Sequence, residues 1–266
     1  MLRLSKLAMV CWGAVVILAF SGSSFADDAP VTANITNGKN IFKNGKPAAG
    51  VPACSTCHGE NAMGNDDMGT PRLVNIGYVY VVKQLTDFAE NRRTPQGLGA
   101  VMNGFAKALS EQDKRDLSAY VNSLPKPNTS ELSDLAALKA GGSTVGEAYK
   151  GKILVRYGGK FSACQSCHGF DGRGADPIYP KIGQQKFVYI FNQLHDWRDG
   201  ANDPKKDPAN GRVNDPLGQM RAIAKNLTDD DINNAATYLS HAEDSTSGDG
   251  MQIDNQMVMK NVTITK

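Results

Sequence analysis

The chain has little that would mark a nucleic-acid-binding, disordered or multi-span membrane protein. Its 266 residues carry 29 basic and 27 acidic side chains. Nucleic-acid binders usually carry a clear excess of basic residues, so this nearly equal balance argues against that class. Aromatic residues make up only 7% and charged residues 21%, which with 41% hydrophobic residues is an ordinary globular composition. Five cysteines and four histidines are few, so their positions carry the argument. The length predicts one large domain or two small ones.

Only one apolar run indicates targeting, and it opens the chain. Residues 1–26 combine a basic start at Arg3 and Lys6, an apolar stretch over residues 7–20, and small residues up to Ala26. This pattern predicts a signal peptide that is cleaved after Ala26, and therefore export to the periplasm. The alternative is an uncleaved membrane anchor, which is disfavoured because the stretch falls short of the roughly 20 residues that a spanning helix needs.

The four cysteines after this segment occur in two copies of one motif. Cys54-Ser-Thr-Cys57-His58-Gly59 recurs 110 residues later as Cys164-Gln-Ser-Cys167-His168-Gly169. Segments on both sides of the motif also match with few insertions, so the chain is a tandem duplication. A period near 110 residues is longer than that of solenoid repeats and denotes two whole domains. We expect a first domain, a linker, a second domain and a C-terminal extension at residues 27–127, 128–146, 147–243 and 244–266.

Helical periodicity dominates both halves. The apolar residues of 78–88 fall at i, i+3, i+4, i+7 and i+10, which is a single stripe, and residues 187–197 repeat it. Ser110 and Thr228 are typical N-caps of a final helix, because each is followed three residues later by an aspartate. Strand patterning is nearly absent. The sequence therefore predicts an all-α fold, in which each half is a small helical bundle.

The chemistry is concentrated in the Cys-x-x-Cys-His motif. This spacing lets two thiols add to the two vinyl groups of one haem while the adjacent imidazole binds the iron. We therefore expect Cys54 and Cys57 to attach one haem, and Cys164 and Cys167 to attach a second. Three alternatives are weaker. A thioredoxin-like redox pair lacks its βαβ setting, a zinc site lacks the usual spacing, and plain disulfides leave the adjacent histidine unexplained.

Histidine and methionine are the expected axial ligands of each iron. His58 and His168 complete the motifs, and a soft thioether opposite each would raise the reduction potential and favour electron transfer. Met102 and Met220 recur at aligned positions just before the final helix of each half, so we expect them to be the sixth ligands. A lone methionine is more often core filler, and five have no counterpart: Met63, Met68, Met251, Met257 and Met259. Two histidines are alternative ligands, although an isolated histidine is usually polar surface: His195 and His241.

A proline follows each motif histidine at nearly the same distance. Pro71 and Pro180 stand 13 and 12 residues after His58 and His168. A carbonyl there could accept the imidazole Nδ1–H, which would orient the ring and tune its basicity. The alternative is a proline that only shapes the loop.

Both halves resemble class I cytochrome c domains, and the pair resembles the dihaem cytochrome c4 family of bacterial periplasms. The resemblance rests on residues 54–59 with Met102, and on residues 164–174 with Pro180, Gly183, Gln184 and Met220. It implies two covalent haems with His/Met ligation, near each other across the domain interface. It also implies single-electron transfer from a donor, a dehydrogenase or a quinol-oxidising complex, to an acceptor such as a terminal oxidase. Peripheral association with membrane complexes is compatible with this expectation.

Two other functions stay open. The chain could be the electron-transfer subunit of a larger periplasmic oxidoreductase, with loop 198–219 and the tail 244–266 as its interface rather than as solvated extensions. It could instead be a dihaem enzyme, a peroxidase or a thiosulfate-oxidising protein, which needs one iron with a displaceable ligand. The two matched methionines disfavour an enzyme, and no catalytic triad or carboxylate pair stands out. The leading expectation is a carrier without catalytic residues.

Overall fold

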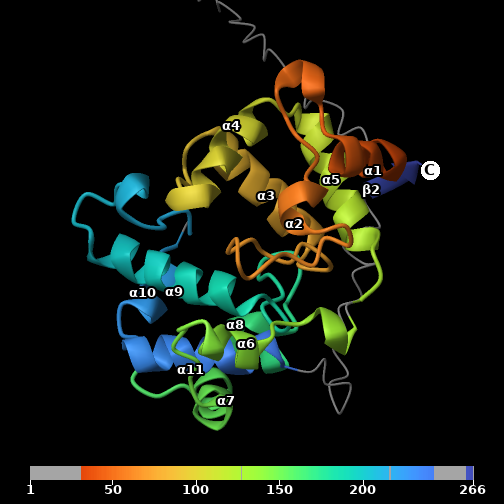
Figure 1. Ribbon diagram of the computed structural model, residues 1–266. Helices are drawn as coiled ribbons and strands as arrows, with labels where there is room; N and C mark the ends of the chain where they lie inside the picture. The colour runs from red at the N-terminus through yellow and green to blue at the C-terminus, as the bar shows by residue number, and fades with distance from the viewer. Residues whose placement is uncertain (1–30, 127, 216, 243–261, 266) are drawn as a thin grey trace, which may run out of the picture.

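The computed structural model describes residues 31–126, 128–215, 217–242 and 262–265. Within these ranges helices dominate and form two similar bundles, one from each half of the chain (Figure 1). The mostly helical fold that the sequence predicts is confirmed. The predicted signal peptide 1–26 and residues 244–261 of the predicted extension lie outside the described residues. None of the described helices is long and apolar enough to cross a membrane.

The two halves carry the same order of helices. The first half contains β1 (Val31–Asn34), α1 (Ile35–Asn44), α2 (Ser55–His58), α3 (Tyr78–Ala89), α4 (Val101–Lys107) and α5 (Glu111–Ser123). The second half contains α7 (Ala148–Tyr157), α8 (Gln165–His168), α9 (Phe187–Asn202), α10 (Gln219–Ala224) and α11 (Asp229–Ser240). Short 3-10 turns lie between these helices: η1 (Pro47–Ala49), η2 (Gly97–Ala100), η4 (Phe170–Gly172) and η5 (Pro208–Asn210). The segment between the halves contains η3 (Thr129–Glu131) and α6 (Leu135–Ala140).

In each half the first and last helices cross at a glycine. Gly38 of α1 meets the backbone of α5 so closely that a Cβ on it would lie 2.1 Å from the Asp116 carbonyl oxygen. Gly151 of α7 meets α11 in the same way, since a Cβ would lie 2.0 Å from the Asn234 carbonyl oxygen. Only a residue without a side chain permits this approach. The glycines therefore fix the helix pair on which each half is built.

The predicted apolar stripes are confirmed on α3 and α9. Val81 and Phe88 of α3 are buried, as are Ile190 and Trp197 of α9. Each stripe packs against the last helix of its own half, α5 or α11. An amphipathic helix is stabilised mainly by burying such a face, so these contacts close the two hydrophobic cores.

The last helix of each half begins where the sequence predicts. The hydroxyls of Ser110 and Thr228 accept the backbone N–H three residues on. The carboxylates of Asp113 and Asp231 accept the N–H of the capping residue in return. Loss of such a cap costs about 1 kcal/mol of helix stability.

A small parallel sheet departs from the predicted all-helical fold. β1 pairs with β2 (Val262–Thr265), in a register that runs from Val31 opposite Val262 to Asn34 opposite Thr265. The C-terminal strand therefore returns to the first half. Strands of four residues show no readable alternation, and a partner from the opposite end of the chain leaves no local signal in the sequence.

The segment between the halves is folded onto both of them. Leu135 and Leu138 of α6 pack against the second core. The Glu131 carboxylate accepts a hydrogen bond from Asn61 of the first half (3.1 Å), and its carbonyl oxygen accepts one from Lys186 of the second (2.9 Å). Residues 128–146, which the sequence divides off as a linker, thus contact both bundles.

The two halves meet through a buried polar interface. The Arg72 backbone N–H donates to the Gln185 side-chain oxygen (2.7 Å), and the Gln185 amide donates back to the Arg72 carbonyl (2.9 Å). The predicted loop 198–219 is shorter in the structure, because α9 continues to Asn202 and α10 begins at Gln219. The segment between these helices crosses to the first half as well, where the buried Asn214 donates to the Asp87 carboxylate (2.6 Å). The sequence allows this loop to be either an interface for a partner or a solvated extension. In the structure, part of the loop is instead buried against the first half of the same chain.

Candidate haem-binding sites

Each Cys-x-x-Cys-His motif folds as one short helical turn that presents its histidine to the interior. α2 begins after Cys54 and ends at His58, and α8 begins after Cys164 and ends at His168. Both histidines are buried, with 8% and 6% of the residue exposed. All four motif cysteines are free thiols of intermediate burial. One turn of helix thus brings two thiols and one imidazole together in each half.

The structure places each motif histidine against the backbone of a proline loop. His58 Nδ1 lies 3.1 Å from the Pro71 carbonyl oxygen, and His168 Nδ1 lies 2.9 Å from that of Pro180. In both rings the Nδ1–H donates, which leaves Nε2 for another ligand. The carbonyls stand where they would orient a ligating ring, and their effect on its basicity stays a prediction.

A glycine in each half lets the proline loop come this close. A Cβ on Gly64 would lie 2.5 Å from the Pro71 carbonyl carbon, and one on Gly174 would lie 3.3 Å from that of Pro180. Their φ angles of +72° and +91° also lie in the region that favours glycine. The match of Gly64 with Gly174 in the sequence therefore marks the turn that gives each histidine its backbone partner.

Burial determines the protonation state of the motif histidines and of the first cysteine of each motif. It lowers the pKa of His58 and of His168, although the proline carbonyls oppose the shift, so each ring is neutral, the form that binds a metal. Burial also raises the pKa of Cys54 and of Cys164 to about 11. A catalytic redox pair needs a thiol with a lowered pKa. These neutral thiols do not fit that alternative.

Met102 and Met220 occupy equivalent places, the second residue of α4 and of α10. Next to Met102, Asn103 donates to the Phe88 carbonyl (2.9 Å), which ties the start of α4 to α3. Met220 packs against the cluster that contains Trp197 of α9. Each methionine thus stands at the start of a short helix fixed to the central helix of its half. Their role as sixth ligands stays a prediction.

The other described methionine and histidine candidates contact core residues, an aromatic ring or a hydroxyl group. Met63 is buried in the first core, which is the ordinary role of a methionine. His195 packs on the ring of Phe191, with 4.4 Å between ring centroids. His241 Nδ1 lies 3.0 Å from the Ser240 hydroxyl. Three further methionines lie outside the described residues: Met251, Met257 and Met259.

The donor set fits covalent haem better than zinc. Among the residues that the structure describes, no three histidine, cysteine or carboxylate side chains converge to hold a metal ion. A structural zinc site needs four such ligands. Each motif instead offers one imidazole nitrogen and two free thiols. A c-type haem requires these groups, for one axial bond and two thioether bonds.

The family follows from a comparison with known proteins. A family model of cytochrome c matches residues 35–125 and 156–243, which include both motifs. The chain belongs to the cytochrome c family. Domains of this family bind haem covalently, so the two motifs account for two c-type haems. A bound haem supplies one-electron cycling between ferric and ferrous iron.

Two curated relatives cover most of this cytochrome. The thiosulfate dehydrogenase electron acceptor of Stutzerimonas stutzeri (strain A1501) is 30% identical over 218 residues, which are 81% of this chain and 91% of the relative. Cytochrome c4 of Thiocapsa roseopersicina is 30% identical over 205 residues, 73% of this chain and 92% of the relative. The resemblance to the dihaem cytochrome c4 family is confirmed, and electron transfer with it.

Solved structures show the same two-domain fold. Reduced cytochrome c4 from Pseudomonas stutzeri has a TM-score of 0.60 and 26% identity, and the match covers 80% of this chain and 100% of that one. Thiosulfate dehydrogenase TsdBA from Marichromatium purpuratum has a TM-score of 0.65 and 25% identity over 77% of this chain. This cytochrome spans only 40% of the TsdBA chain.

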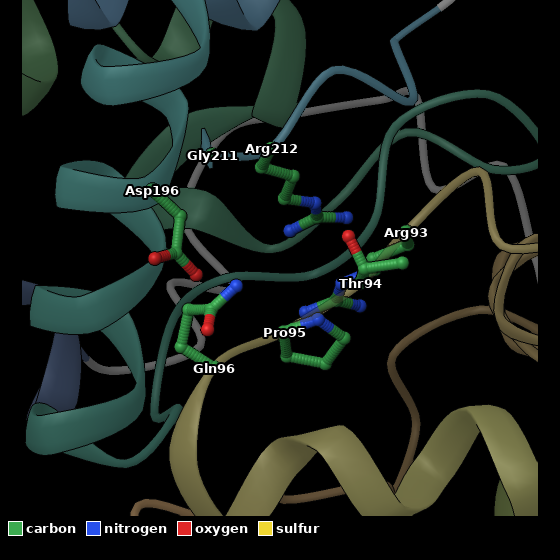
Figure 2. Close-up of a pocket in the computed structure, with 7 residues that line it drawn as sticks. All are labelled: Arg93, Thr94, Pro95, Gln96, Asp196, Gly211 and Arg212. Carbon is green, nitrogen blue, oxygen red and sulfur yellow. The ribbon is translucent and has the colours of Figure 1, made fainter. Parts of the chain in front are cut away.

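The sequence analysis does not identify two buried arginines. Arg93 and Arg212 are 6% and 7% exposed, and they line one small pocket at the boundary between the halves (Figure 2). Each stands five residues before a Leu-Gly pair, so the duplication relates them. That signal was available in the sequence. Their burial was not, because it depends on packing between distant segments.

Proposed function

We propose that this cytochrome is a periplasmic electron carrier that accepts electrons from a dehydrogenase acting on thiosulfate or a similar sulfur oxyanion. The haems are attached through Cys54 and Cys57 in domain 27–127, and through Cys164 and Cys167 in domain 147–243. Four axial ligands complete the two irons: His58, Met102, His168 and Met220.

The repeated histidine geometry is the observation that carries this proposal. Both halves have a buried imidazole, a backbone carbonyl within 3.1 Å of its Nδ1, and an aligned methionine at the start of a short helix. A site of this kind has both axial positions filled, which favours electron transfer over chemistry at the iron. An enzyme would instead keep one position open.

The proposed donor rests on the relatives. Two of them, from Stutzerimonas stutzeri and Thiomonas intermedia, are named thiosulfate dehydrogenase electron acceptors, and the match covers 91% and 77% of their lengths. In the TsdBA structure the likeness covers 40% of a longer thiosulfate dehydrogenase chain. These observations favour a dehydrogenase partner over a quinol-oxidising complex. They also support a closely related role, as the dedicated electron-transfer subunit of such a dehydrogenase.

The proposal is tested by stopped-flow reduction of the oxidised dihaem protein. A thiosulfate dehydrogenase supplied with thiosulfate should reduce both haems, whereas thiosulfate alone should reduce neither. Reduction by thiosulfate alone would contradict the carrier and indicate an enzyme. A dehydrogenase that turns over with an artificial acceptor but leaves this cytochrome oxidised would contradict the proposed donor. Fractionation of the periplasm of the native host checks the location.

A further inference from the structure

The outer face of α7 carries three large apolar side chains that are exposed. Tyr149, Ile153 and Tyr157 are 73%, 39% and 72% exposed. Because they are spaced four residues apart, they lie on one side of the helix, and we call them the α7 stripe. The opposite side of α7 packs on α11. α7 itself lies at the end of the second half that is far from the first half (Figure 1), so the stripe faces away from both cores.

The duplication shows that the fold does not require this stripe. Gly38 of α1 and Gly151 of α7 meet the last helix of their halves in the same way, which aligns the two helices. The residues at the three matching positions of α1 are exposed and polar: Thr36, Asn40 and Asn44. The same helix crossing is therefore built with a polar outer face in the first half. Single exposed apolar residues are common, whereas a contiguous apolar stripe on a helix face that is normally polar marks an interaction surface.

Basic side chains flank the α7 stripe. At 100° per residue, Lys150 and Lys152 lie on either side of it, and Lys160 follows the C-terminal end of the helix. Lys150 pairs with Glu147 (2.5 Å), but among the described residues neither Lys152 nor Lys160 forms an ion pair. No aspartate or glutamate occurs in residues 148–162. The face thus has an apolar centre and a cationic rim, which fits a protein surface with an apolar centre and a rim of carboxylates.

α7 leads directly into the second Cys-x-x-Cys-His motif. Tyr157 stands seven residues before Cys164. The Arg156 carbonyl accepts a hydrogen bond from the side chain of Gln165, which lies inside the motif. α7 also packs against α8 and η4, the two turns that the motif opens. A protein bound to the α7 stripe would therefore stand beside the second proposed haem site.

We propose that the α7 stripe and its flanking lysines are the surface on which the donor dehydrogenase docks, through an apolar patch rimmed by carboxylates. This inference rests on the proposed function, in which the dehydrogenase loses one electron for each ferric iron that is reduced. Tyrosines supply large, rigid contact area at the centre of an interface, and lysines at its rim speed the encounter with an acidic partner. A second copy of this chain would bring two lysine rims together, which like charge disfavours. Two relatives are named electron acceptors of a dehydrogenase, so that enzyme is the favoured occupant.

The test measures the KM and kcat of thiosulfate dehydrogenase, supplied with thiosulfate, for the full dihaem cytochrome as its acceptor. One variant gives the α7 stripe the residues of the first half: Tyr149→Thr, Ile153→Asn and Tyr157→Asn. α1 carries these residues at the same positions, so this stripe variant should fold, and circular dichroism and haem spectra check that it does. Leu98→Asn is the matched control, because Leu98 is an apolar residue of the first half that is 64% exposed. Reduction by ascorbate checks that both haems of each protein still accept electrons.

We expect the stripe variant to raise KM about tenfold and to leave kcat nearly unchanged, because central tyrosines of an interface often contribute this much to binding. Leu98→Asn should leave KM unchanged. A second variant, Lys152→Gln with Lys160→Gln, should raise KM several-fold at low ionic strength. That difference should vanish in about 1 M salt, where the Debye length is only about 3 Å.

The possible failures are distinguishable. Unmodified cytochrome that the dehydrogenase does not reduce contradicts the proposed function, and this inference falls with it. Unmodified cytochrome that is reduced, with an unchanged KM in the stripe variant, overturns the docking surface alone. An equal rise of KM in Leu98→Asn also overturns it, because the effect would then not be local to α7. If the stripe variant does not fold, an unchanged KM of the lysine variant at low ionic strength overturns the proposal.

Two other occupants of the stripe are outcomes of the same set of variants. Sedimentation equilibrium of the cytochrome alone detects a second copy, and flotation with phosphatidylglycerol vesicles detects an anionic membrane surface. A dimer or vesicle binding that is lost in the stripe variant, while KM for the dehydrogenase stays unchanged, assigns the stripe to that occupant and overturns the proposal.

Discussion

Substitution of Gly38 by alanine should loosen the first half at the crossing of α1 and α5. The new Cβ would lie 2.1 Å from the Asp116 carbonyl oxygen and 2.9 Å from the Tyr120 Cβ, so the two helices must separate by roughly 1 Å to restore van der Waals contact. Overpacking of this kind costs about 1–3 kcal/mol, and the upper part of that range applies because the nearest atom is backbone. Alanine regains up to about 1 kcal/mol of helix propensity. The expected net loss is about 2 kcal/mol.

Gly104→Ala is the matched control for this crossing. Gly104 is also inside a helix, α4, but it is exposed and a Cβ there would meet nothing within 4 Å. It should therefore stabilise the protein by up to about 1 kcal/mol through helix propensity alone. The two variants make the same chemical change and are expected to differ in sign.

Denaturant and thermal unfolding of the dihaem protein, followed by circular dichroism at helix wavelengths and by haem absorption, separates these outcomes. A loss of about 2 kcal/mol should lower the midpoint of the first half by roughly 8–16 °C, since 1 kcal/mol is worth about 4–8 °C in a domain of this size. The equivalent variant Gly151→Ala should act on the second half. Gly38→Ala that unfolds at or above the midpoint of Gly104→Ala would refute the argument from close helix approach.

Three further predictions concern charge, the interface and ligation. Burial on its own raises the pKa of Asp171, but hydrogen bonds from Arg156 and Tyr238 hold it below its usual value. Asp171→Asn should therefore cost about 1–3 kcal/mol at pH 7. In denaturant titrations at several pH values that difference should shrink as pH falls below about 4 through the folded-state pKa, and a constant difference would contradict the assignment. Asn214→Ala removes the bonds to Gln84 and Asp87 and should lower the free energy of unfolding by about 1–3 kcal/mol with unchanged haem spectra, whereas the exposed Asn210→Ala on the same loop should have little effect. His195→Gln should leave both haem spectra unchanged, and loss of a low-spin band would restore His195 as a ligand.

Local patterns in the sequence predicted the helices. The strand pairing and the docking of α6 depend on contacts between distant segments and could not be predicted in this way. The stripes on α3 and α9 and the caps at Ser110 and Thr228 were readable because helix periodicity and capping act within a few residues. The pairing of β1 with β2 could not be read from the sequence, because it joins the two ends of the described chain. The docking of α6 on the second core depends in the same way on distant partners.

In the candidate sites too, residues with a local sequence signal could be predicted, whereas residues whose burial depends on distant contacts could not. The duplicated motifs pointed to the cysteines and histidines because thioether chemistry needs a fixed spacing. Comparison of the halves added Met102 and Met220, and the offset of the prolines predicted a carbonyl partner for each imidazole. Arg93 and Arg212 stayed hidden because a basic residue in a loop is usually exposed. Their burial comes from Tyr189, Gln193, Tyr80 and Gln84 across the interface.

The central claim is that each half holds one haem between a histidine and a methionine. Ferric and ferrous absorption spectra of the purified protein test it most directly, combined with haem quantitation and with added cyanide or carbon monoxide. We predict two low-spin haems per chain, a methionine–iron charge-transfer band that is lost stepwise in Met102→Ala and Met220→Ala, and no rapid ligand binding. A high-spin fraction in the unmodified protein, or one haem that binds cyanide or carbon monoxide readily, would contradict the account.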